Sequence, residues 1–438
     1  MTTAVRPAPP ATQPSRPRAA PPPGLRGWLG VQAINVQRHL DALRPFAEDE
    51  FGAGAGAPSA GHIREVNRLM ADLRRSLTAE TTAAVEAVRI ATASPGTPAL
   101  HRVLRHKERA HTWVRAVEQV WDFYFELFGQ RQSRVGDRLL ACDRIALDCY
   151  QTAFVNLGAA RSIPAPAPYS YMRTGFSPAT FRRNIPLRRL GRRLNPFPLI
   201  QLPYHRLVNP WTLGAVLHEV SHNLQNDLGL AQAVPLRLEA ALAAANVEDP
   251  VRRVWLRWHR ETFADLSALL LGGPAVVASL MDVVGRAPAT VVAYSSTGPH
   301  PTPYLRPALS IDLLRRMGFP GHADRYARLW RRLYPRVPGG TIPAAVLRGA
   351  PRIVPLVVET MCFTPYPSLG DRRLTDVLRF APKEQSMVEE AAERLATGTD
   401  PGVIPERFLI GAARSALDRR LAPPPAVTTA FYRQLARR

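Results

Sequence analysis

The sequence of 438 residues contains no charge-free stretch of about 18 or more apolar residues, the minimum for a membrane-spanning helix. The nearest candidate, Leu266 to Met281, is shorter, contains a Gly-Gly-Pro break and is flanked by Asp265 and Asp282, so it predicts a core helix and a turn. A secretory leader is not expected either, because Met1 to Gly24 mixes proline, alanine and arginine without an apolar block. We therefore predict a cytoplasmic protein with no membrane span.

Cysteine is also scarce, and the chain contains just Cys142, Cys149 and Cys362. So few thiols agree with a reducing compartment rather than with a disulfide framework. Cys142 and Cys149 would share one face of a helix, which favours buried, small apolar residues over a pair of metal ligands. No Cys-x-x-Cys pair and no histidine-rich tract offers a competing zinc site.

Lysine is almost absent, since Lys107 and Lys383 are the two lysines in the chain. The net charge of +22 comes from arginines scattered over the whole sequence, a compositional bias that favours a solvated surface. The densest clusters are Arg182-Arg183, Arg188-Arg189 and Arg192-Arg193. They could hold an acidic substrate or partner, or a phosphate backbone, but no recognised RNA or DNA module accompanies them. Nucleic-acid binding therefore stays an alternative that the charge does not exclude.

One short motif stands out, His218-Glu219-Val220-Ser221-His222. Two residues four apart lie one above the other on a helix, so His218 and His222 can offer two imidazole nitrogens to one metal ion. Glu219 lies between them, where a carboxylate can take a proton from a water molecule activated by that metal. The motif predicts a zinc helix with its general base.

The residues around this motif favour a helix. Asn209 is a good N-cap, Pro210 suits the first helical position, and Gly229 is a natural stop. An apolar stripe at helical spacing would anchor the helix to a core: Leu213, Leu217, Val220 and Leu224. Upstream, the short apolar run between Pro198 and Pro203 predicts an edge strand leading into the site.

A catalytic zinc needs a third protein ligand. A second helix is predicted from Val251 to Leu271, and it carries Glu261 and Asp265. Glu261 can supply the oxygen ligand, while Asp265, one turn on, can accept the second ring N–H of a zinc-bound histidine. Three other residues are rival third ligands, namely Glu239, Glu248 and His259.

Together these motifs resemble those of the glutamate-zincin metallopeptidases, because the first motif is followed by an ExxAD-type helix, Glu261 to Asp265. His300 to Arg306 is similar to the motif that closes the catalytic core in the CAAX prenyl proteases and the heat-shock membrane protease HtpX. The likeness covers roughly residues 195–335. It implies the following roles: zinc ligands His218, His222 and Glu261, base Glu219, supporting Asp265, and His300 with Arg306 near the substrate or the developing oxyanion.

Relatives in that group are often embedded in a membrane, so a prenylated or intramembrane substrate does not carry over to this chain. We expect a zinc-dependent peptidase acting on a peptide or protein substrate. A plain packing or capping role is the alternative for His300, and packing is the alternative for Tyr294 on the same loop. At the level of the whole chain, the rivals are a non-catalytic regulatory or binding protein on a zincin scaffold, and an arginine-rich nucleic-acid-binding protein.

The expected fold is mainly α, a helical zincin-like catalytic core with a small β edge between N- and C-terminal helical regions. Glycine- and proline-rich breaks divide the chain as follows: a disordered tail at 1–24, a helical region at 25–160, a Pro/Arg-rich linker at 161–196, the catalytic core at 197–335 and a helical region at 336–438. The linker could also run across the active-site cleft. A mobile end is expected from Pro423 to Arg438.

Overall fold

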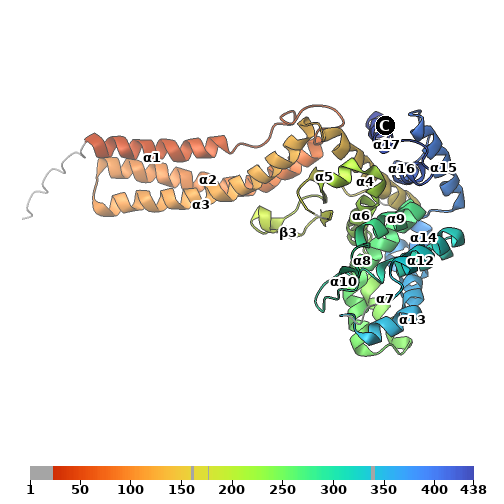
Figure 1. Ribbon diagram of the computed structural model, residues 1–438. Helices are drawn as coiled ribbons and strands as arrows, with labels where there is room; N and C mark the ends of the chain where they lie inside the picture. Colours follow the sequence, from red (N-terminus) through yellow and green to blue (C-terminus); the bar gives the residue numbers. More distant parts are fainter. Residues whose placement is uncertain (1–22, 159–161, 176, 337–340) are drawn as a thin grey trace, which may run out of the picture. The chain divides into compact units, whose positions relative to one another are not determined.

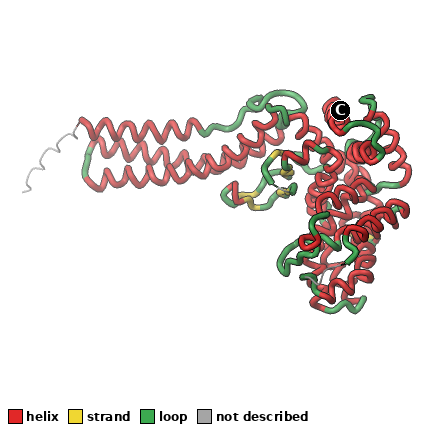
Figure 2. The backbone as a smooth tube through the Cα atoms, in the orientation of Figure 1, coloured by secondary structure: helices red, strands yellow, loops and turns green. Residues whose placement is uncertain are grey.

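Helices make up most of the protein, and its strands are few and short (Figure 1, Figure 2). The computed structural model describes residues 23–158, 162–175, 177–336 and 341–438. The prediction of a mainly α fold with a small β component is confirmed. Residues 1–22 of the predicted tail lie outside the described residues. No helix in the described part of the chain is both long and apolar enough to cross a membrane.

The described residues form two compact units. The first comprises residues 23–46 and 67–122, and the second comprises residues 47–66 together with the described residues from 123 onward. The division falls inside two long helices, α2 (Ala60–Ala93) and α3 (Thr97–Gly129), and not in the segment 161–196.

The first unit contains α1 (Pro23–Ala42) and most of α2 and α3. Its small core contains apolar side chains from all three helices: Leu29, Ala87, Val88, Ala91 and Val103. Polar contacts add to this packing, since Lys107 Nζ donates to Gln32 Oε1 and His106 Nδ1 lies 3.1 Å from Glu80 Oε2. Further apolar side chains outside this cluster are also buried along the three helices, among them Val36, Met70, Leu77 and Val117.

The second unit contains the remaining helices and all of the described strands. Its helices are α4 (Gly136–Leu157), α5 (Tyr204–Val208), α6 (Gly214–Asp227), α7 (Leu230–Ala244), α8 (Asp249–Gly272), α9 (Pro274–Val284), α10 (Pro288–Val291), α11 (Arg306–Arg316), α12 (Pro320–Leu333), α13 (Ala344–Val358), α14 (Leu374–Val377), α15 (Pro382–Ala396), α16 (Phe408–Asp418) and α17 (Pro424–Arg437). They share one large apolar core. In Figure 1 the green helices α6, α8 and α9 lie together within this unit.

The main sheet has three strands in the order β1 (Tyr169–Met172), β5 (Leu199–Leu202) and β2 (Ala179–Phe181). β5 runs parallel to β1 and antiparallel to β2, so the edge position predicted for this strand is wrong. Pro198 and Pro203 lie just outside β5, and their missing N–H groups therefore do not interrupt the ladder. Although Pro198 has no N–H to donate, its carbonyl accepts a hydrogen bond from the N–H of Tyr169 in β1.

The segment predicted as a Pro/Arg-rich linker supplies both partners of β5. It also forms a small hairpin from β3 (Pro186–Leu187) and β4 (Arg193–Leu194). A second small hairpin follows much later, between β6 (Pro365–Tyr366) and β7 (Arg372–Arg373). Short strands can form in a proline-rich segment because each needs just a few consecutive N–H groups.

The predicted start of the helix that carries His218 and the predicted mobile C-terminal end both differ from the structure. Asn209 and Pro210 begin a separate 3₁₀ turn, Pro210–Thr212, and α6 starts at Gly214 without a side-chain cap. The C-terminal end is not mobile but forms α17, which packs with α4 and α16. Apolar residues at helical spacing explain this packing, since Val427, Phe431 and Leu435 are fully buried.

All three cysteines are free and buried, as the sequence predicts. Cys142 and Cys149 lie on α4 in the large core, and Cys362 lies in the turn of π-helix that follows α13. Burial raises the pKa of each thiol well above its usual range. The thiols therefore act as small apolar groups.

The helix α6 is fixed on two sides. Its apolar stripe, Leu217, Val220 and Leu224, is fully buried, and the helix packs closely against α8. At its N-terminal end, a Cβ on Gly214 would lie 2.7 Å from the Cβ of Ser279 on α9, so glycine permits this close approach. The end of α6 therefore cannot shift without moving α9.

A buried ion pair fixes the far end of α8. Arg407 donates to both carboxylate oxygens of Asp148 on α4, at 2.8 and 2.9 Å, and its Nε donates to the carbonyl of Leu271 at 2.9 Å. Both side chains are less than a tenth exposed. One guanidinium thus joins α4, α8 and the start of α16.

We expect Asp148→Ala to lower the free energy of unfolding by about 3–5 kcal/mol, because it leaves the Arg407 charge buried without its partner. Urea denaturation followed by circular dichroism measures this change. The matched control is Asp324→Ala, which removes a half-exposed pair with Arg315 and should leave the free energy of unfolding nearly unchanged. Equal losses in the two variants would contradict the role of the buried pair.

Candidate metal centre

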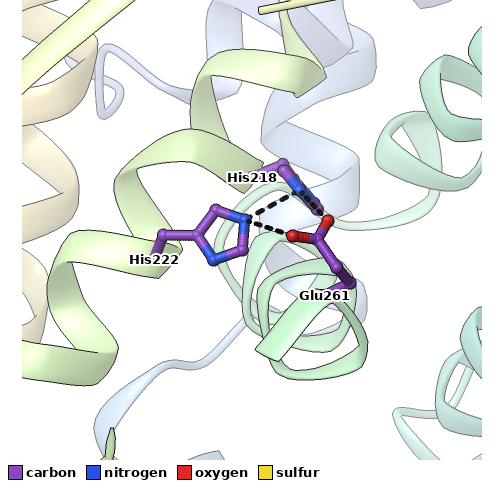
Figure 3. A group of neighbouring side chains, drawn as sticks. All are labelled: His218, His222 and Glu261. Atoms are coloured by element: carbon purple, nitrogen blue, oxygen red, sulfur yellow. Dashed lines mark hydrogen bonds and ion pairs between the residues drawn. The ribbon is translucent and has the colours of Figure 1, made fainter. Parts of the chain in front are cut away.

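Two histidine side chains meet on one face of α6 (Figure 3). The Nε2 atoms of His218 and His222 lie 3.2 Å apart, and the two rings are nearly perpendicular at 89°. This is the arrangement that a spacing of four residues gives on a helix. Both nitrogens point to the same side, toward α8.

Glu261 on α8 completes a group of three donors. Its Oε2 lies 3.3 Å from His218 Nε2, and its Oε1 lies 3.4 Å from His222 Nε2. The three residues could hold a metal ion, since each offers one ligand atom and these atoms lie within 4.8 Å of one another. The structure thus brings together the three ligands predicted from two separate motifs.

The size of this group can be compared with zinc coordination. A regular tetrahedron whose centre lies about 2.05 Å from each donor, as zinc lies from histidine nitrogen, has edges of about 3.3 Å. The 3.2 Å between the two histidine nitrogens is close to that value, while the 3.3 and 3.4 Å separations end on different oxygens of Glu261. Taken as one atom from each residue, the donors lie within 4.8 Å of one another, which suits three ligands of a single ion.

Asp265, one turn after Glu261, holds the other side of His218. Its Oδ1 lies 2.8 Å from His218 Nδ1, which leaves Nε2 facing the site. Arg306 donates to the same carboxylate through Nε and Nη2, both at 2.8 Å. The hydrogen bonds run in one chain from Arg306 through Asp265 to His218, as expected for the support of a metal ligand.

These hydrogen bonds favour a different role for Arg306 from the one that the resemblance implies. Resemblance implied a position near the substrate or the oxyanion, but the guanidinium is largely buried and its Nε and Nη2 donate to Asp265. A bidentate pair of this kind fixes the orientation of a carboxylate. Arg306 therefore fits a positioning role for Asp265 better than direct contact with a reacting oxygen.

The pKa values describe how the group shares its protons. Burial lowers the pKa of His218, but hydrogen bonds to Asp265 and Glu261 outweigh this effect and raise that pKa to about 10. Burial and the nearby positive charge of His218 lower the pKa of His222 to about 3. Burial would raise the pKa of Glu261, yet the bond to His218 and its charge bring that pKa down to about 2. At neutral pH the group is an imidazolium, a neutral imidazole and a carboxylate.

Glu219 lies beside this group and lines the same cleft. Its side chain is largely buried, and burial raises its pKa to about 7. A carboxylate with a pKa near neutrality can both accept and return a proton at physiological pH. Glu219 can therefore exchange a proton with a molecule bound in the cleft.

His300 approaches from the loop before α11. Its Nε2 lies 3.2 Å from Glu261 Oε2, while its side chain is 60% exposed. His300 lines the cleft next to the candidate ligands and stays open to a substrate. The alternative of a helix-capping role is not favoured, because no side-chain cap is found at α11.

The rival ligands lie elsewhere. Glu239 pairs with Arg252 at 3.1 Å, Glu248 is exposed at the start of α8, and His259 Nδ1 bonds to the Leu256 carbonyl. None of them joins the candidate ligand group among the described residues. Tyr294 lies on the same loop as His300, and packing was the alternative role considered for it. Its hydroxyl accepts a hydrogen bond from Arg257, and its ring packs against Trp258.

The site opens into a cleft of about 780 Å³. One wall contains residues 177–180 and Arg182, from and around β2, so the segment predicted as a linker does reach the cleft. The opposite wall is apolar and comes from α9: Val276, Leu280, Val283 and Val284. The first wall agrees with the prediction that the linker could run across the cleft, but the second was missed, although the hydrophobic run of α9 directly after Gly273 could have indicated it.

β2 is attached to α6, the helix that carries His218 and His222. Asn223 on α6 donates to Thr180 Oγ1 at 2.8 Å, and that hydroxyl donates to the Leu199 carbonyl of β5. Tyr169 and Tyr171, which the predicted cleft segment included, are instead buried in the core.

Comparisons with known proteins give no further guidance, since no family model, no curated protein and no solved structure matches the chain. The functional assignment therefore depends on the geometry of the side chains in this cleft and on the chemistry of their groups.

In protein freed of metal by a chelator, we expect His218 to titrate well above pH 6.5. Because its folded pKa is raised above the unfolded value, its contribution to the free energy of unfolding is complete below about pH 6.5 and is lost as the pH rises toward 10. Asp265→Asn removes the charged partner and should lower the pKa of His218, which histidine NMR measures directly. The resonance of His259, bonded to a backbone carbonyl, serves as the internal control. A wild-type midpoint at or below pH 6.5 would contradict this account.

Proposed function

We propose that this chain is a zinc-dependent metallopeptidase of the glutamate-zincin type, which hydrolyses peptide bonds with Glu219 as general base. The observation that carries the proposal is the placement of Glu219 in one cleft with His218, His222 and Glu261. A purely structural zinc site needs no acidic neighbour open to a cleft, whereas hydrolysis requires one.

The donor set supports zinc. Two imidazole nitrogens and one carboxylate are the protein ligands found in a common class of catalytic zinc sites. All three side chains are less than a fifth exposed, so they are held in place before any ion binds. When bound, zinc supplies Lewis-acid chemistry, because it polarises a scissile carbonyl and makes water more acidic.

Glu219 moves the proton. With a pKa of about 7, its carboxylate accepts a proton from the attacking water and then gives it to the leaving amine. Glu219 lines the cleft together with His218, His222 and Glu261, so a peptide bound there would lie beside its carboxylate. One group can therefore serve both steps.

The neighbouring residues hold this arrangement. Asp265 fixes the ring of His218, and Arg306 fixes Asp265. His300, exposed at the cleft, can donate a hydrogen bond to the carbonyl oxygen as negative charge develops on it. A cytoplasmic location stays a prediction, which three free, buried thiols support.

We expect purified protein to bind about one equivalent of zinc per chain. His218→Ala should remove it, because one of three ligands and its support from Asp265 are lost. His259→Ala is the matched control on α8 and should retain the metal, since that ring bonds to a backbone carbonyl. Mass spectrometry of metals, with circular dichroism as a test of folding, measures both. Zinc retained at full occupancy in His218→Ala would rule out this site.

Glu219→Gln should lower peptide turnover by about 10²- to 10⁴-fold, the usual contribution of a general base, while zinc stays bound. Turnover is measured by mass spectrometry of products from a broad peptide library. Glu389→Gln, an exposed change on α15, should leave the rate unaltered. If wild type and Glu219→Gln are equally inactive while both hold zinc, a non-catalytic binding protein is the better assignment.

A further inference from the structure

One side of the cleft carries positive charge that no described group balances. Arg182 follows β2, Arg260 precedes Glu261 on α8, and both line the cleft. Neither guanidinium has an ion pair or a side-chain hydrogen bond with any of the residues described in the structure. By contrast, Arg306 in the same cleft donates two hydrogen bonds to Asp265, so the carboxylate balances its charge.

The two free arginines lie close to each other and to the metal ligands. Arg182 directly follows β2, whose Thr180 accepts a hydrogen bond from Asn223, the residue after His222, and Arg260 directly precedes Glu261 on α8. Burial and then the charge of Arg260 lower the pKa of Arg182. Arg182 is partly buried, so water screens this repulsion incompletely. A repulsive pair of this kind becomes stabilising when an anion binds between or beside it.

A third donor lies on the same side. Gln225 is on α6, one turn beyond His222, and its side chain is 1% exposed. It lines the cleft, and its Nε2 has no hydrogen-bond partner among the described residues. A buried amide donor without a partner is costly and uncommon in folded proteins. Two guanidinium groups and one amide thus offer donors for an acceptor from outside the chain.

The wall formed by α9 differs in polarity from the side that carries Arg182, Arg260 and Gln225. The α9 side presents Val276, Leu280 and Val283, which suit an apolar group. A substrate in the cleft therefore meets donors near His222 and hydrocarbon near the N-terminal half of α6. The first side therefore offers donors to an anionic group, while Arg286, which follows α9, also lines the cleft.

We propose that the side of the cleft formed by Arg182, Arg260 and Gln225 binds a carboxylate of the peptide substrate, so that the enzyme selects peptides that present a carboxylate at this place. This inference rests on the proposed peptidase function. A carboxylate matches the donors, because guanidinium binds it through two parallel hydrogen bonds and an amide can donate a third. The carboxylate can belong to an Asp or Glu side chain or to the C-terminus of the peptide.

The test compares matched peptides on the full, zinc-loaded chain. Each pair differs by Glu or Gln at one position, and a second set differs by a free or an amidated C-terminus. We expect kcat/KM to be about tenfold or more higher for one charged member, the ratio that one charge-assisted bond provides. The set in which the preference appears identifies the source of the carboxylate.

Variants then assign the preference to residues. Arg182→Gln and Arg260→Gln should each bring the ratio of charged to uncharged peptide toward one. Arg260 is exposed, so Arg260→Gln should fold even if Arg182→Gln does not. Arg348→Gln removes an exposed arginine of α13 outside the cleft and should keep the wild-type ratio. A parallel measurement uses calorimetry to compare the binding of both peptides to zinc-loaded Glu219→Gln protein, which needs no turnover.

The outcomes separate the two proposals. Cleavage without a charge preference, or with a preference that both arginine variants retain, overturns the carboxylate site and leaves the peptidase standing. If no peptide is cleaved, the proposed peptidase function is overturned, and calorimetry then tests the carboxylate site by itself. Tighter binding of the acidic peptide that Arg260→Gln abolishes supports the carboxylate site, whereas equal binding overturns it as well.

Discussion

The carboxylate of Asp265 accepts hydrogen bonds from His218 and Arg306 at the same time, and the candidate centre depends on this sharing. The three residues come from α6, α8 and α11, so one buried anion fixes the relative positions of three helices. Without Arg306, Asp265 would be an unbalanced buried charge. Without Asp265, the ring of His218 would lose the bond that turns Nε2 toward Glu261.

The same pairing sets the charge of the cleft. Asp265 and Arg306 neutralise each other, so the other acidic and arginine side chains that line the cleft are Glu219 and Glu261, near the histidines, and Arg182, Arg260 and Arg286. Negative groups lie where a cation would bind, and positive groups lie where a substrate would extend. This separation along one cleft is the electrostatic pattern expected of a site that binds a metal and an acidic ligand side by side.

Local geometry could be predicted from the sequence, and tertiary geometry could be predicted in part. His218 and His222 share a face because of their spacing alone, and Glu261 could be chosen because its helix also carries Asp265. The role of Arg306 could not be predicted, since it pairs with Asp265, a residue 41 positions away in the sequence and on a different helix. The central position of β5 was also missed, because its partners come from a segment whose prolines suggested irregular structure. The lack of an ion-pair partner for Arg182 and Arg260 among the described residues could not be predicted either, because it depends on which residues are their neighbours in three dimensions.

The burial of the cysteines has a practical consequence for work on the cleft. Cys142, Cys149 and Cys362 are inaccessible, and their raised pKa values keep them as thiols rather than thiolates at neutral pH. Maleimide reagents attack thiolates that solvent can reach. One cysteine introduced on each wall would therefore carry fluorescent or spin labels selectively, and the opening of the cleft could be followed by spectroscopy with all native thiols retained.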